Sequence, residues 1–321
     1  MRGATPDRVP VFPLLMSIAA DRHGISYKEF ASNYNALAEA QINITERFDI
    51  DAVTVCSDAF RVTADLGGKI YFPLDAPPRL TERLISSEAD FKKLGKPDTG
   101  KGRMFDRIRA AETLAKRIGT KKYLCGWVDM PFAEACSTCG VSEFMYMLYD
   151  EPLLAHRILE FFTGIVIDFA LAQVEAGCDI IGCGDAAASL VSRGFYTEFA
   201  LPYEQAVTKA VRGAGKKAKL HICGDTDKIL DILPQSGCEL FSIDHMVDLR
   251  KARDIFRCAG LAFKGNLNPV LLISSTETEV RKLAADCIGA AKGASYMLSA
   301  GCEIPAATPD NNLKTFCESV K

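Results

Sequence analysis

The feature of this sequence that most constrains its fold is a repeating alternation of short apolar runs and longer amphipathic segments. From residue 179 onward, one run and one segment recur roughly every 20 to 40 residues, which is the rhythm of β–α–β units. Compact and nearly continuous apolar runs are typical of parallel strands that are covered on both faces. We therefore expect strands at 52–56, 122–128, 179–184, 219–224, 240–244, 261–266 and 295–301.

Segments with helical periodicity separate these runs, and one more strand is expected near the N-terminus, in the stretch VPVFPLLMSIAA. Eight strands in 321 residues predict a (β/α)8 TIM barrel with additional N-terminal helices, because such barrels typically have about 250 residues. A doubly wound sheet is the alternative, but it needs a phosphate-binding glycine turn, and neither GxGxxG nor GxxxxGK(S/T) occurs in the sequence. The expected helices lie at 27–48, 104–117, 143–174, 197–214, 227–233, 249–258 and 277–291.

Composition narrows the class of protein further. The chain is 48% hydrophobic and 25% charged and contains no linker-like tract, so we expect a single domain over residues 1–321. A formal charge of −3 provides no net positive field for nucleic-acid phosphates, and no run reaches the roughly 18 to 20 apolar residues of a membrane span. Twelve cysteines are too sparse for a disulfide scaffold, which favours reduced cysteines in a cytoplasmic protein.

Polar and metal-binding side chains gather where the expected strands end. In a (β/α)8 barrel the carboxyl ends of the strands form the active-site face. The pattern therefore predicts a functional site at this rim. The residues concerned are Asp58, Asp129, Asp185, His221, Cys223, Asp244, Asn266 and Cys302.

A metal site is the most specific expectation for this rim. His221 and Cys223 end the strand KLHICG, and residues two apart on a strand point to the same side. Imidazole nitrogen and thiolate sulfur are preferred zinc donors, and three protein ligands leave one position open for a substrate. Cys302, just after the last strand, is the best-placed third donor. The alternative is a core histidine and two cysteines packed as small apolar residues, and the residue pattern leaves both interpretations open.

Several stretches, taken together, resemble the uroporphyrinogen decarboxylase superfamily. Within it, they are similar to the branch of cobalamin-dependent methyltransferases that includes methylcobamide:coenzyme M methyltransferases. The stretches are LHICGDTDKIL, LFSIDHMVDL, GNLNP, YMLSAGCEIPAATPDNN, DRVPV and DIIGCGDAAAS, and they extend over nearly the whole chain. The resemblance implies a (β/α)8 barrel and a zinc ion (Zn²⁺) bound by His221, Cys223 and Cys302.

The resemblance also implies a reaction. A methyl group would move between a corrinoid such as methylcobalamin, as co-substrate, and a small-molecule methyl donor or acceptor. Domains that carry cobalamin typically present a DxHxxG motif, and this sequence has none, so we expect the methylcobamide on a separate corrinoid protein. Zinc would hold a substrate thiol deprotonated, or would act as a Lewis acid on a methyl donor. The residues do not decide the direction of transfer, nor whether the small substrate is a thiol, a folate or an O- or N-methyl compound.

Three further residues are candidates for catalysis. Asp244 is a candidate fourth zinc ligand, and it could instead orient another ligand or cap the following helix. Asp185 and Asn266 are expected at the substrate site, with the alternative that they only fix a loop of the rim.

Two other functions stay open. A metal-free porphyrinogen decarboxylase needs several cations for the carboxylates of its substrate, but the corresponding stretch PVFPLLMSIAADRHG carries only Arg22, which disfavours this activity. A non-catalytic protein that binds zinc or a corrinoid is the other alternative.

Overall fold

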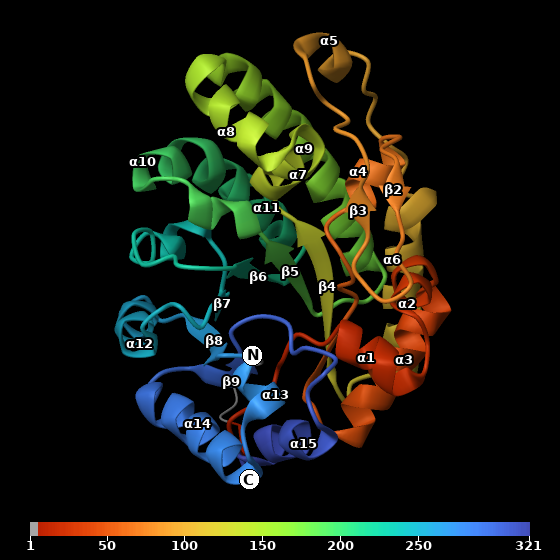
Figure 1. Ribbon diagram of the computed structural model, residues 1–321. Coiled ribbons are helices and arrows are strands. Elements are labelled where there is room, and N and C mark those ends of the chain that lie inside the picture. The colour runs from red at the N-terminus through yellow and green to blue at the C-terminus, as the bar shows by residue number, and fades with distance from the viewer. Residues whose placement is uncertain (1–5) are drawn as a thin grey trace.

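Seven parallel strands form one curled sheet at the centre of the molecule (Figure 1). The structure is a computed structural model and describes residues 6–321. Every pair of neighbouring strands in this sheet is parallel, and the sheet order follows the chain, so the α/β class and the seven expected strands are confirmed. The strands in sheet order are β1 (Ala52–Thr54), β4 (Tyr123–Asp129), β5 (Ile180–Gly184), β6 (Lys217–Ile222), β7 (Leu240–Ile243), β8 (Ala262–Leu267) and β9 (Tyr296–Ala300).

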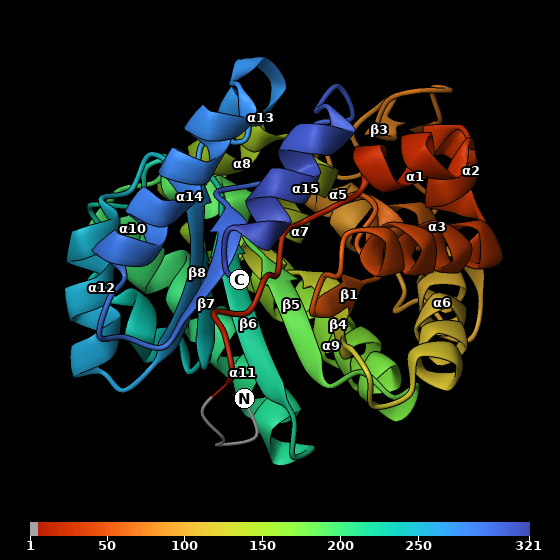
Figure 2. The ribbon, with the colours of Figure 1, turned by 90° about the horizontal axis from the view of Figure 1, so that it is seen from below.

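Helices surround the sheet (Figure 1). Figure 2, turned by 90°, shows α13, which follows β8, at the upper end of the sheet, where the strands have their carboxyl ends. The expected N-terminal helices are present as α1 (Ser17–His23), α2 (Tyr27–Ser32) and α3 (Tyr34–Arg47). The remaining helices are α4 (Arg61–Asp65), α5 (Glu88–Phe91), α6 (Gly102–Ile118), α7 (Pro131–Cys139), α8 (Val141–Asp150), α9 (Pro152–Glu175), α10 (Arg193–Phe195), α11 (Leu201–Gly213), α12 (Leu249–Cys258), α13 (Leu271–Ser274), α14 (Glu277–Ala290) and α15 (Asp310–Glu318).

Short irregular elements complete the chain. Strands β2 (Ile70–Tyr71) and β3 (Arg79–Leu80) form a small antiparallel pair between β1 and β4. Single turns of 3₁₀ helix span Ala186–Leu190 and Leu233–Ser236, and a π-helical turn spans Tyr196–Ala200. No helix among residues 6–321 is long and apolar enough to cross a membrane.

The prediction of an eighth strand near the N-terminus is wrong, because no regular strand precedes β1 in the described residues. Residues 10–12 instead lie between the two edges of the sheet: the Phe12 N–H donates to the Leu298 carbonyl of β9 at 2.9 Å, and the Asp51 N–H donates to the Val11 carbonyl at 3.1 Å. Two isolated bridges, Val11 to Leu298 and Leu14 to Glu303, form in this stretch in place of a regular strand. Pro10 and Pro13 have no N–H to donate, so a longer ladder cannot form here.

Three expected helices also differ from the structure. The helix expected at 27–48 breaks at Asn33, which is extended and whose side chain caps α3. The helix expected at 143–174 breaks before Pro152, which begins α9. Residues 227–233 form turns rather than a helix, with hydrogen bonds from Ile229 to Thr226 and from Ile232 to Ile229. Pro234 follows directly and disfavours helical conformation in the residue before it.

Candidate metal centre

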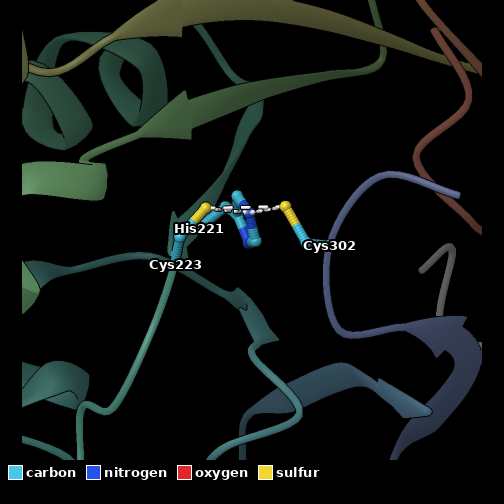
Figure 3. Close-up of side chains that lie close together, drawn as sticks. All are labelled: His221, Cys223 and Cys302. Carbon is cyan, nitrogen blue, oxygen red and sulfur yellow. Dashed lines mark hydrogen bonds between the residues drawn. The ribbon is translucent and has the colours of Figure 1, made fainter. Parts of the chain in front are cut away.

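The three predicted zinc ligands converge at the carboxyl ends of the strands (Figure 3). The Cys223 Sγ lies 3.1 Å from His221 Nε2 and 3.6 Å from the Cys302 Sγ. The Cys302 Sγ lies 3.8 Å from the same Nε2. Figure 3 shows one sulfur on each side of the imidazole. The fold thus brings Cys302 next to a residue pair from which it is separated by about 80 positions in the sequence.

The orientation of His221 is set by the neighbouring strand. His221 lies in β6 and is buried, and its Nδ1 lies 3.1 Å from the carbonyl oxygen of Ser242 in β7. A carbonyl oxygen only accepts, so Nδ1 carries the proton and donates it. In the neutral imidazole, Nε2 is therefore the nitrogen without a proton and faces the sulfurs, and the neutral imidazole is the form that binds metals.

The position of Cys302 depends on the glycine before it. A Cβ atom added to Gly301 would lie 2.3 Å from the backbone nitrogen of His245 and 3.0 Å from the carbonyl carbon of Asp244. Gly301 also donates its N–H to the carbonyl of Leu267 at 2.9 Å. Only a residue without a side chain lets the end of β9 approach the loop after β7 this closely.

Glu303 fixes the other side of Cys302. Its Oε1 accepts hydrogen bonds from the backbone N–H and the hydroxyl of Ser17, both at 2.6 Å. The next residue, Ile304, donates its N–H to the carbonyl of Leu14 at 3.0 Å. The segment after β9 is thus held against the N-terminal segment, and the Cys302 sulfur has a defined place.

The thiols of Cys223 and Cys302 differ in acidity. A hydrogen bond from the Cys223 thiol, together with the nearby His221, lowers the pKa of Cys302 to about 4. The same hydrogen bond and burial raise the pKa of Cys223 well above its usual value. At least one sulfur is therefore a thiolate at neutral pH, and thiolate is the form that binds metal.

The donor set and its dimensions fit a zinc ion. Ligand atoms that lie 2.0–2.3 Å from a tetrahedral centre are about 3.5–3.8 Å from one another. The three distances between the donor atoms, 3.1, 3.6 and 3.8 Å, are close to these values. One nitrogen and two sulfurs leave a fourth position that a water molecule or a substrate can take.

Asp244 and Asn266 both hold the loop that follows β7. The Asp244 Oδ1 accepts the Met246 N–H at 3.0 Å and lies 2.8 Å from the His245 Nδ1. The Asn266 amide donates to the carbonyls of Asp244 at 3.0 Å and Val247 at 2.7 Å. Among the described residues, no oxygen of Asp244 belongs to the group of ligand atoms within 4.8 Å of one another. For Asn266 these contacts match the loop-fixing alternative, and its role at a substrate site stays a prediction. The following helix, α12, is capped by Asp248 and not by Asp244, and zinc ligation by Asp244 stays a prediction.

Asp185 is not among the three clustered ligands, although its backbone N–H donates to the His221 carbonyl at 2.9 Å. Its side chain is fully buried near the buried Glu204, which accepts the Tyr196 hydroxyl at 2.6 Å. Burial raises the pKa of Asp185 well above its usual value and that of Glu204 to about 7, so this carboxyl pair holds a proton. Contact of Asp185 with a substrate stays a prediction.

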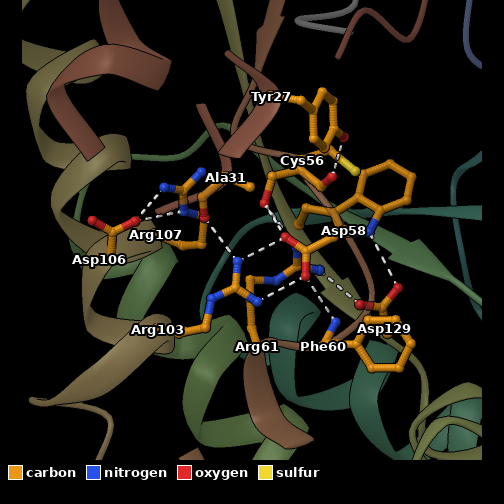
Figure 4. Close-up of polar contacts among 12 residues, drawn as sticks. Tyr27, Ala31, Cys56, Asp58, Phe60, Arg61, Arg103, Asp106, Arg107 and Asp129 are labelled. Carbon is orange, nitrogen blue, oxygen red and sulfur yellow. Dashed lines mark hydrogen bonds and ion pairs between the residues drawn. The ribbon is translucent and has the colours of Figure 1, made fainter. Parts of the chain in front are cut away.

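A buried group of paired charges lies after β1 and at the end of β4 (Figure 4). Asp58 forms a bidentate pair with Arg103, both contacts at 2.8 Å. Arg61 donates from Nη2 to Asp129 Oδ2 at 2.6 Å. Burial opposes ionisation of Asp58, but Arg103 outweighs it and lowers the pKa of Asp58. Asp58 and Asp129 were both visible as polar residues at strand ends, whereas nothing in the sequence pairs either with its arginine.

The fold and the site define the class: an α/β protein whose curled parallel sheet carries a His–Cys–Cys centre at the carboxyl ends of its strands. A family model described as uroporphyrinogen decarboxylase (URO-D) matches residues 1–321. The chain belongs to this family.

Relatives in two branches of the family are similar to the chain. The methylcobamide:CoM methyltransferase MtbA of Methanosarcina acetivorans is 29% identical over 251 residues, which cover 77% of this chain and 72% of the relative. The uroporphyrinogen decarboxylase of Microcystis aeruginosa is 25% identical over 340 residues, covering 100% of this chain and 95% of the relative. The resemblance to the superfamily and its methyltransferase branch is confirmed, and decarboxylases match as well.

Solved structures agree on the fold. A methyltransferase from Methanosarcina mazei superposes with a TM-score of 0.89 at 22% identity, covering 99% of this chain and 95% of that structure. A B12-independent methionine synthase from Shewanella sp. W3-18-1 superposes with a TM-score of 0.60 at 15% identity, covering 97% and 95%. At these identities the likeness concerns the fold alone.

Proposed function

We propose that this protein is a zinc-dependent methyltransferase. It moves a methyl group between a corrinoid, methylcobamide carried on a separate corrinoid protein, and a small substrate such as a thiol, a folate or an O- or N-methyl donor. The observation that carries the proposal is the convergence of His221 Nε2 with the sulfurs of Cys223 and Cys302. The similarity to MtbA, a protein described as acting on methylcobamide, supports the same reaction class.

His221, Cys223 and Cys302 would hold the zinc ion. When bound, zinc supplies Lewis-acid chemistry, which keeps a substrate thiol deprotonated or polarises the leaving group of a methyl donor. The two cysteine thiolates offset the charge of a divalent ion, so a substrate sulfur at the fourth position stays electron-rich. The carbonyl of Ser242 keeps the correct nitrogen of His221 free, and Gly301 and Glu303 keep Cys302 in place.

The finer architecture is part of the proposal. We infer a (β/α)8 barrel in a single domain over residues 1–321, in which residues 10–12 stand in for the eighth strand. Their hydrogen bonds to Leu298 on one side and Asp51 on the other support this closure. The TM-score of 0.89 over nearly the whole chain supports the single domain.

The corrinoid partner is expected to dock at the carboxyl ends of the strands. Leu190, Met246 and Val270 are each about 60% exposed, and they lie in segments that follow β5, β7 and β8. We infer that these three side chains contribute to the docking surface. A cytoplasmic location goes with this proposal, since the cysteine ligands must stay reduced.

A metal-free decarboxylase is the competing activity, because decarboxylases of the family match the full chain. Arg22, the single arginine of the stretch that would bind substrate carboxylates, is already occupied. Its Nε donates to Asp310 at 2.6 Å, and its Nη atoms donate to the carbonyls of Ala306 at 3.1 Å and Thr308 at 2.5 Å. This arrangement favours methyl transfer over porphyrinogen decarboxylation.

Metal analysis of the purified protein tests the proposal. We expect about one zinc per chain in the wild type, and loss of zinc in Cys223→Ala and in Cys302→Ala. Cys258→Ala is the matched control, because Cys258 is exposed on α12 and should not affect the metal. Zinc retained in both ligand variants would refute the assignment.

An activity assay then separates the three candidate functions. Methyl transfer from methylcobalamin to a panel of thiols and folates, lost after chelation, supports the methyltransferase. Evolution of CO₂ from a porphyrinogen that persists after chelation supports the decarboxylase. Bound zinc without either reaction supports a binding protein.

A further inference from the structure

One acidic side chain faces the candidate metal ligands across a glycine. Asp129 at the end of β4 pairs with Gly184 of β5, and Gly184 pairs with His221 of β6. Residues paired across parallel strands project to the same face of the sheet. Asp129 and His221 therefore share a face, about 9 to 10 Å apart between their Cα atoms, and the residue paired with both, Gly184, has no side chain.

The carboxyl group of Asp129 lies over this glycine. A Cβ atom added to Gly184 would lie 3.0 Å from Asp129 Oδ1 and 3.1 Å from the Trp127 ring. The Trp127 ring in turn lies edge-on to the His221 ring, with the centroids 6.3 Å apart. Apart from the Trp127 indole N–H at 3.4 Å, no hydrogen bond to Oδ1 is found among the described residues, so this oxygen can accept another donor.

The side chain of Asp129 is slightly exposed, whereas that of its partner Arg61 is fully buried. Arg61 contacts Oδ2, and its side chain is 1% exposed, whereas that of Asp129 is 11% exposed (Figure 4). Burial raises the pKa of Asp129 to about 6, so the group is ionised in mildly alkaline buffer. A molecule beside the metal ligands therefore meets the carboxylate and not the guanidinium.

Other cations near the site are equally hidden. Lys219 is 2% exposed, and its Nζ lies 4.6 Å from the centre of the Trp127 ring. Asp244 is a further buried acidic side chain at the same end of the sheet, whereas a bound zinc ion would offset the charge of the two cysteine thiolates. An anionic group placed between Asp129 and His221 would thus face like charges, and a cationic group would face opposite ones.

We propose that Asp129 selects the small substrate by binding a cationic or hydrogen-bond-donating group on its non-reacting part, most simply an ammonium group. The proposal rests on the proposed function, because the reacting sulfur must lie at the zinc site. It deepens that function by naming the substrate class: short aminothiols or neutral thiols, rather than thiols that carry a sulfonate or a carboxylate.

Three thiols with the same two-carbon chain test the proposal: 2-aminoethanethiol, 2-mercaptoethanol and 2-mercaptoethanesulfonate. Their binding to the zinc-loaded protein is measured by titration calorimetry, and kcat/KM is measured with methylcobalamin. The thiols differ in acidity, so the decisive quantity is the change that Asp129→Asn makes in their relative affinities. We expect Asp129→Asn to weaken the aminothiol by about tenfold and to leave mercaptoethanol nearly unchanged, with zinc content unaltered.

Glu134→Gln is the matched control. Glu134 is a second buried carboxyl of the same charge cluster, and burial raises its pKa well above the usual value. Its replacement by an amide should preserve the order of affinities. Equal weakening of all three thiols by Asp129→Asn, unchanged relative affinities, or no binding of any thiol would overturn the proposal.

A second variant covers the case in which Asp129→Asn fails to fold or to hold zinc. Gly184→Ala leaves the Arg61–Asp129 pair in place and puts a methyl group 3.0 Å from Asp129 Oδ1. We expect the preference for the aminothiol to fall, and a preserved preference would contradict the proposal. If the binding order is as expected but no thiol is methylated, the transfer reaction fails while the role of Asp129 stands.

Discussion

His221 and Ser242 are joined by a hydrogen bond of 3.1 Å between the imidazole Nδ1 and a backbone carbonyl oxygen. The acceptor belongs to the backbone, so the bond follows from the register of β6 against β7, in which these two residues are direct partners. The register of the sheet therefore fixes which nitrogen of His221 faces the sulfurs. The candidate metal centre is organised by the fold before any metal binds.

Gly301 is expected to control the position of Cys302. In Gly301→Ala the added methyl group would lie 2.3 Å from the His245 backbone nitrogen, so the end of β9 must move. We expect weaker zinc binding and a loss of stability of about 1–3 kcal/mol, measured by competition with a chromophoric chelator and by urea unfolding.

Gly289→Ala is the control for this variant. Gly289 lies in α14 and a Cβ atom there would meet nothing within 4 Å, so alanine should raise stability by about 0.5–1 kcal/mol and leave zinc binding unchanged. Zinc affinity and stability of Gly301→Ala equal to those of the wild type would contradict the close approach.

The buried pair of Arg61 and Asp129 is expected to matter for stability. Arg61→Ala leaves a buried carboxylate without its cation, which typically costs about 3–5 kcal/mol. Arg193→Ala breaks the exposed pair with Asp231 and should cost less than about 1 kcal/mol. Urea unfolding of both variants measures the two losses of stability. Equally small losses would contradict this expectation and show that water reaches the charges of Arg61 and Asp129.

Glu204 is expected to make stability fall as the pH rises. Burial raises its pKa from 4.5 to about 7, so the folded state holds a proton that the unfolded state releases. The stabilisation is complete below the unfolded pKa and is lost as the pH passes through the folded one, between about pH 5 and pH 8.

Thermal unfolding at both ends of this range checks the assignment. Glu204→Gln keeps a neutral group, so its melting temperature should fall less than that of the wild type between the two pH values. Glu160→Gln, at an exposed position of α9, should behave like the wild type. An identical decline in Glu204→Gln would show that another group is responsible.

The exposed apolar residues Leu190, Met246 and Val270 are expected to bind the corrinoid protein. Val270→Glu places a charge at a residue that is 59% exposed next to α13 and should lower transfer from protein-bound methylcobamide by about tenfold. Transfer from free methylcobalamin should not change. Leu153→Glu, at an equally apolar and 80% exposed position at the start of α9, is the control. Equal effects of both variants, or an effect on free methylcobalamin, would place the docking surface elsewhere.

The sequence was sufficient for the parts that depend on local periodicity. The run KLHICG predicts a strand with His221 and Cys223 on one side, and the convergence of strand ends brings Cys302 to them. It was not sufficient where geometry between distant residues decides. Arg61 and Asp129 are 68 residues apart, and their pairing depends on how α4 lies against β4. Asp185 follows a strand end as expected, but only the turn at Ala186–Leu190 directs its side chain inward.

X-ray absorption at the zinc edge of the purified protein shows which atoms surround the metal. We predict a tetrahedral ion with one nitrogen at about 2.0–2.1 Å and two sulfurs at about 2.3 Å, the fourth ligand being oxygen or, after addition of a thiol, a third sulfur. A spectrum without sulfur neighbours, or a protein that does not retain zinc, would contradict it.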